Sequence, residues 1–137
     1  MSILGITKGT KFEEQIGKNA KGEEQGAGMY TALALLAKEK GLDEVSEILS
    51  KIAMDEARHA GLYAVLNGNA NQDIFTTLSK MAPIESAAAE RLSQFAKSVS
   101  GLGSKEATEA AQQIEAVALD EKRHGEILKN LVEKYSK

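Results

Sequence analysis

The sequence predicts an all-α protein folded as a four-helix bundle. Its 137 residues include a single proline and no tryptophan, and they are rich in Ala, Leu, Glu and Lys, which favour helices. Apolar residues recur with the 3.6-residue period of a helix through four stretches that glycine-containing breaks separate. We expect one domain over residues 1–137, with residues 1–9 as an N-terminal extension.

Each of the four helices has recognisable limits in the sequence. They are expected over residues 10–40, 42–67, 72–99 and from 105 onward. Gly41, the turn cluster 68–71 and the Gly- and Ser-rich break 100–104 separate them. The second and fourth helices each follow a short connection, so we expect two antiparallel helical hairpins.

Composition excludes several classes of function. The absence of cysteine excludes disulfides, thiolate catalysis, zinc knuckles and iron–sulfur or rubredoxin-type centres within these residues. With a net charge of −3 and interspersed acidic and basic residues, the sequence has no basic cluster of the kind that binds nucleic acids or lipid surfaces. We find neither a secretory signal nor an apolar run long enough to span a membrane, and we therefore expect a cytoplasmic protein.

Both histidines of the chain lie in the same frame, Asp-Glu-x-Arg-His, at residues 55–59 and 120–124. On a helix, Glu at i and His at i+3 share one face, so a carboxylate and an imidazole can bind the same ion. Two such pairs, with one further Glu from each of two other helices, are the ligand set of di-metal sites in helical bundles. The repeated frame therefore predicts a di-metal centre.

The two further carboxylates come from matching the halves of the chain. When the two histidine frames are overlaid, with three extra residues allowed in the 100–104 loop, Glu23 matches Glu85. Glu23 and Glu56 are also about equally far from the connection at Gly41, and Glu85 and Glu121 are about equally far from the connection at residues 100–104. Each pair therefore lies level in its hairpin. The predicted metal ligands are Glu23, Glu56, His59, Glu85, Glu121 and His124.

This ligand set favours hard divalent cations. Its carboxylates and neutral imidazoles carry a charge of about −4, which two divalent ions neutralise. Oxygen donors with imidazole suit iron or manganese, and zinc also fits. Glu24 is an alternative to Glu23, and Glu90 is an alternative to Glu85.

Residues around the ligands have two possible roles each. Asp55 and Asp120 can accept the second ring N–H of a histidine, or pair at the surface with the arginine of their own frame. Tyr30 and Tyr63 can act as hydrogen-bond donors or radical-quenching groups beside the metals, or pack in the core. Gly22 and Gly26 allow a close helix approach or access to the metals.

The segment Gly22-Glu23-Glu24-Gln25…Tyr30, followed by the two Glu-x-x-His frames, resembles rubrerythrin, a family of the ferritin-like superfamily. The resemblance covers residues 10–136 and implies a ferritin-like bundle with two irons that reduces hydrogen peroxide to water. Without a rubredoxin domain, electrons must come from an external donor such as a rubredoxin. Many rubrerythrins also carry a Glu one turn after the third-helix ligand, and this chain departs from that pattern with Ala88.

Other functions remain open alongside a peroxide reductase. The oxidant can be dioxygen, and the protein can be a ferroxidase that handles iron or a manganese catalase-like enzyme. A metal-free interaction bundle leaves the paired frames unexplained.

The connection between the two halves is short for a ferritin-like bundle, whose second and third helices are joined by a crossover along the whole bundle. Residues 67–72 cannot cover that distance. We therefore expect a homodimer in which the first hairpin of one chain pairs with the second hairpin of its mate. The alternatives are an up-down-up-down monomer or unwinding of residues 72–82.

Overall fold

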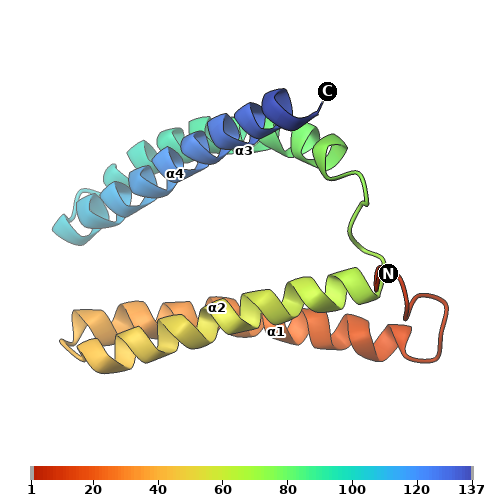
Figure 1. The fold of residues 1–137 in the computed structure, drawn as a ribbon. Helices are drawn as coiled ribbons and strands as arrows, with labels where there is room; N and C mark the ends of the chain where they lie inside the picture. The colour runs from red at the N-terminus through yellow and green to blue at the C-terminus, as the bar shows by residue number, and fades with distance from the viewer. Residues whose placement is uncertain (1, 137) are drawn as a thin grey trace. The chain divides into compact units, whose positions relative to one another are not determined.

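The computed structural model describes residues 2–136 and confirms the all-α prediction. Its helices are α1 (Glu13–Glu39), α2 (Asp43–Leu66), α3 (Ile74–Ser100) and α4 (Lys105–Tyr135) (Figure 1). The helix α1 packs against α2, and α3 packs against α4, so each half of the chain is a hairpin. Within the described residues, no helix is long and apolar enough to cross a membrane.

The first hairpin turns at Gly41, whose positive φ of 71° allows the tight connection. The amide of Leu42 donates to the Ala37 carbonyl at 2.9 Å, which closes the carboxyl end of α1. The Ser46 hydroxyl donates to the Ala34 carbonyl at 2.8 Å and so joins α2 to α1. This short turn holds the two helices antiparallel and fixes which residues lie level.

The N-terminal extension folds back onto the first hairpin as a series of turns that continue to residue 12. The amide of Thr7 donates to the Leu66 carbonyl at 3.0 Å. Asn67, which is only 5% exposed, accepts a hydrogen bond from the Thr7 hydroxyl at 2.6 Å and donates to the Glu13 carbonyl at 2.9 Å. The extension thus ties the beginning of α1 to the end of α2.

The second hairpin has a capped beginning on each helix. Asp73 accepts from the Thr76 amide at 3.0 Å, and Ser104 accepts from the Ala107 amide at 3.0 Å. The expected start near residue 72 is therefore slightly early, because the Asp73 cap places the first helical residue at 74. The helix α3 is continuous through Pro83, and residues 74–82 before the proline are helical and not unwound.

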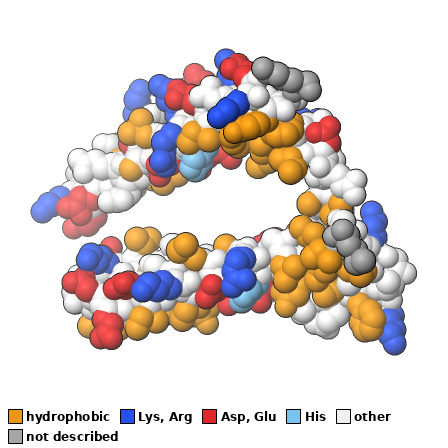
Figure 2. All heavy atoms as spheres, in the orientation of Figure 1, with side chains coloured by type: hydrophobic (Ala, Val, Ile, Leu, Met, Phe, Trp, Pro, Cys, Tyr) orange, Lys and Arg blue, Asp and Glu red, His pale blue; other side chains and the backbone are white. Residues whose placement is uncertain are grey.

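The core of each hairpin is made of small residues. Apart from Gly125 and Asn67, every buried residue in the described chain is an alanine, and no large side chain is fully buried. Large apolar side chains such as Met29 (61% exposed), Leu36 (51%) and Phe95 (56%) lie at the surface. Figure 2 shows apolar surface on both hairpins. Two helices cannot enclose these side chains, so they lie exposed on each hairpin.

Candidate metal centre

The first hairpin brings together Glu23 from α1 with Glu56 and His59 from α2. One ligand atom from each of these residues lies within 4.8 Å of the other two, and all three residues are half-buried. The His59 Nδ1 atom is 3.4 Å from the Glu23 Oε2 atom. We call this group the first triad. It forms because Glu56 and His59 share a helical face and the Gly41 turn sets Glu23 level with them.

The second hairpin repeats this arrangement. Glu85 from α3 lies with Glu121 and His124 from α4, again with ligand atoms within 4.8 Å of one another. The His124 Nδ1 atom is 3.6 Å from Glu85 Oε2 and 3.7 Å from Glu121 Oε2. We call this group the second triad. The structure therefore brings all six predicted ligands into two groups of the same chemical composition.

Each triad holds two carboxyl groups with one oxygen of each within 4.8 Å of the other. The pKa of Glu56 is raised, chiefly because its carboxyl group hydrogen-bonds to Glu23, with contributions from desolvation and the Glu23 charge. The pKa of Glu121 is raised in the same way by its hydrogen bond to Glu85, by desolvation and by the Glu85 charge. Without a cation, these carboxylates repel one another and favour protonation.

One carboxylate oxygen in each triad has no donor. The Oε2 atoms of Glu23 and Glu85 are buried and accept no hydrogen bond, although a buried polar atom normally has a partner. A divalent cation would satisfy these oxygens and neutralise the paired carboxylates. Carboxylate and imidazole donors at this spacing fit iron or manganese, and they also accept zinc.

The alternative glutamates lie outside both triads. Glu24 is exposed on α1. Glu90 lines a groove between α3 and α4 with Ser93, Glu115 and Lys122, separate from the second triad. The geometry therefore favours Glu23 and Glu85 over these two as ligands.

The flanking aspartates pair with arginines of their own frames. Asp55 Oδ1 lies 3.3 Å from Arg58 Nη2, and Asp120 Oδ1 lies 2.9 Å from Arg123 Nη2, with all four side chains largely exposed. This is the surface alternative of the two roles expected for them, and their role as histidine acceptors stays a prediction. Tyr30 and Tyr63 are half-buried, and their roles beside a metal also stay predictions.

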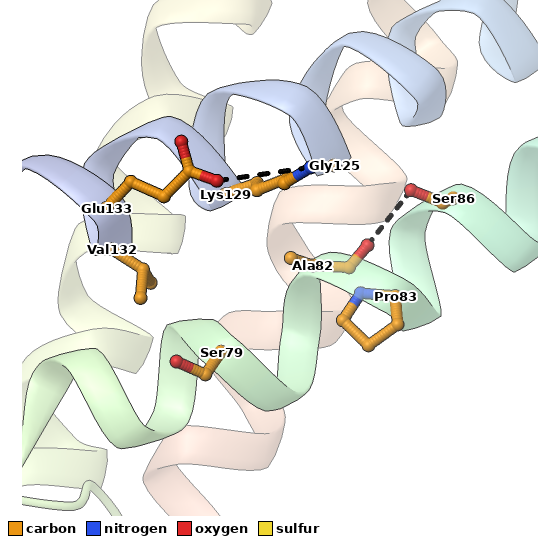
Figure 3. Close-up of a pocket in the computed structure, with 8 residues that line it drawn as sticks. All are labelled: Ser79, Ala82, Pro83, Ser86, Gly125, Lys129, Val132 and Glu133. Atoms are coloured by element: carbon orange, nitrogen blue, oxygen red, sulfur yellow. Dashed lines mark hydrogen bonds and ion pairs between the residues drawn. The ribbon is translucent and has the colours of Figure 1, made fainter.

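A separate groove of about 390 Å³ runs between α3 and α4 (Figure 3). Its lining comprises Ser79, Ala82, Pro83, Ser86, Gly125, Lys129, Val132 and Glu133. The Ser86 hydroxyl donates to the Ala82 carbonyl at 3.2 Å, and Lys129 pairs with Glu133 at 3.9 Å. No triad residue lines this groove, so the groove is separate from both triads.

Comparisons with known proteins show the family of the chain. The Rubrerythrin family model matches residues 14–132, which include both triads. An uncharacterized protein of Methanocaldococcus jannaschii is 34% identical over 98% of this chain and 93% of its own length. Reverse rubrerythrin-1 of Clostridium acetobutylicum is 31% identical over 98% of this chain and 74% of its own length. No solved structure matches. The chain belongs to the rubrerythrin family, and its four helices agree with a ferritin-like bundle.

Proposed function

We propose that the two triads together bind a pair of iron ions and that the protein reduces hydrogen peroxide to water. The observation that carries this proposal is the repeated group of two glutamates and one histidine, each with a buried carboxylate oxygen that lacks a donor. Glu23, Glu56 and His59 would bind on one side of the pair, and the second triad on the other. Manganese or zinc in the same ligands is an outcome that metal analysis distinguishes.

The reaction needs two electrons and two protons for each peroxide, since H₂O₂ + 2e⁻ + 2H⁺ gives two molecules of water. Two adjacent ferrous ions would supply those two electrons when bound. The glutamates would bind the ions as carboxylates and the histidines as neutral imidazoles, so metal binding competes with protonation of these groups. Carboxylates have two oxygens each, so they can change between one and two bonds as the charge of the site changes.

In this proposal an external electron donor returns the two oxidised irons to the ferrous state. The 137 residues contain no cysteine, so they cannot hold a rubredoxin-type iron centre. A rubredoxin or a protein of similar potential is a suitable donor. Dioxygen is the alternative oxidant. A ferroxidase would retain the oxidised iron, and a manganese catalase-like enzyme would convert peroxide without a reductant.

We also propose that the protein acts as a homodimer that exchanges hairpins. The Asn69 amide donates to the Ala64 carbonyl at 2.8 Å, and Asp73 caps α3, so residues 70–72 form the short connection between the two hairpins. From Asn69 to Ile74 the chain reaches about 18 Å when extended. A ferritin-like crossover must cover about 15 Å from Glu56 to the end of α2 and a further ~16 Å along α3 to Glu85.

The connection is therefore about 13 Å too short for a single chain to close a ferritin-like bundle. A second copy removes this limit, because the first hairpin of one chain can pair with the second hairpin of the other. The apolar side chains exposed on each hairpin supply a surface for such pairing. Each metal pair then takes one triad from each chain.

Anaerobic loading with Fe²⁺ tests the proposed activity. The protein should bind two irons per pair of triads and oxidise them faster with peroxide than with oxygen. Glu56→Ala should lose the pair, whereas Glu24→Ala, which removes an exposed carboxylate of the same helical bundle, should keep it. Faster oxidation by oxygen, or full iron binding by Glu56→Ala, would contradict the proposal.

A further inference from the structure

Gly26 on α1 faces the carboxyl group of Glu56. A Cβ atom added at Gly26 would overlap Glu56 Oε2 and would lie 3.3 Å from Glu56 Cδ. Gly22 and Gly28, on the same helix, have no such neighbour within 4 Å. The missing side chain at position 26 therefore leaves the space that the Glu56 carboxylate occupies, directly against the backbone of α1.

The second hairpin has a methyl group at the corresponding position. Gly26 follows Glu23 by three residues, and Ala88 follows Glu85 by three residues. In the second triad, His124 lies within ion-pair distance of both Glu85 and Glu121. In the first triad, the ion pair described for His59 is with Glu23 alone.

The difference between the triads has a steric reason. At Gly26 the Glu56 carboxylate can lie against α1 because no Cβ is present, whereas position 88 of the second hairpin carries the methyl group of an alanine.

We infer that Gly26 is a positioning residue that sets the place of the Glu56 carboxylate in the first triad and makes the two triads unequal. This inference rests on the proposed role of the triads in metal binding. A methyl group at position 26 would displace the Glu56 carboxylate without disturbing the helix, because the displaced atoms are the end of a flexible side chain. Alanine also favours the helical conformation over glycine.

The test compares Gly26→Ala with Gly28→Ala in the full-length protein. Both substitutions make the same gain in helix propensity, but the structure places a metal-binding side chain only beside Gly26. Fe²⁺ binding is measured anaerobically by competition with a chelator, and urea unfolding of the metal-free protein is measured in parallel. Both readouts are independent of turnover.

We expect Gly26→Ala to weaken one of the two bound irons about tenfold, as displacement of a supporting group commonly does. The other iron should bind as in the wild type, and the unfolding midpoint should not fall. Gly28→Ala should leave both affinities unchanged. If the wild type binds two irons and the Gly26→Ala and Gly28→Ala variants bind iron equally, the inference about Gly26 is overturned and the proposed function is not. A wild type that binds no iron pair would instead overturn the proposed function.

Discussion

A complementation experiment tests the exchange of hairpins between two chains. The perturbation is one substitution in each of two chains: Glu56→Ala removes a ligand of the first triad, and Glu121→Ala removes a ligand of the second. In an exchanged dimer of one chain of each kind, one metal centre carries both substitutions. The other takes the intact first triad of the Glu121→Ala chain and the intact second triad of the Glu56→Ala chain.

The expected magnitude follows from the connection between α2 and α3. It can span about 18 Å where a ferritin-like crossover needs about 31 Å, so closure within one chain requires about three or more residues of α2 or α3 to unwind, because each adds about 3.5 Å of reach and shortens the gap by about 1.5 Å. Unwinding on that scale would expose backbone groups of α2 or α3 that are now helical. We therefore expect the mixed dimer to bind one complete iron pair, and either variant alone to bind none.

The assay gives the two chains different affinity tags, purifies the mixed dimer through both, and measures iron per dimer after anaerobic loading. The control mixes wild-type chains with a Glu56→Ala/Glu121→Ala double variant. Exchange predicts no complete centre in that mixed dimer, because each centre lacks one ligand. A complete centre in the control and none in the complementing mixture would refute the reasoning, and so would a monomer that binds a full pair.

Three further predictions concern folding and protonation. Gly125→Ala should destabilise the protein by about 1–3 kcal/mol in urea unfolding, since its Cβ would lie 3.1 Å from the Ala82 carbonyl oxygen, whereas Gly61→Ala, with no neighbour within 4 Å, should not. Asn67→Ala should lower the free energy of unfolding by about 2 kcal/mol, because it removes the hydrogen bonds that the buried Asn67 side chain makes with Thr7 and Glu13. The raised pKa values of Glu56 and Glu121 favour the folded metal-free state at low pH. That stabilisation should be fully present below the ordinary value of 4.5 and should disappear as pH rises through the raised values, while iron affinity rises over the same range. A metal-free protein whose stability increases across that window would contradict the assignment.

Local patterns in the sequence were sufficient for the helices and for most of the candidate site. Helical periodicity places the elements, and it depends only on neighbouring residues. The Glu-x-x-His spacing brings two ligands to one face of one helix, and a short turn brings the opposite glutamate level with them. These relations hold in any antiparallel hairpin, so Glu23, Glu56 and His59 could be grouped without coordinates.

The start of α3 shows the limit of such reasoning. Periodicity places the beginning of this helix near residue 72, but the Asp73 side chain caps the helix, so its first residue is Ile74. The sequence could not decide between Glu85 and Glu90 by spacing alone. The structure separates them, because the direction in which α4 packs against α3 turns Glu85 toward His124 and Glu90 toward a groove.

The sequence by itself determined the helical class, the two equivalent frames and the chemical character of the predicted ligands, because these depend on residue type and on spacing along one helix. Tertiary structure decided which carboxylate oxygens are buried without a donor, that Asp55 pairs with Arg58, and that Gly26 makes room for Glu56. These features depend on how closely two helices approach and on where their side chains point. Such distances arise only when residues far apart in the chain pack together.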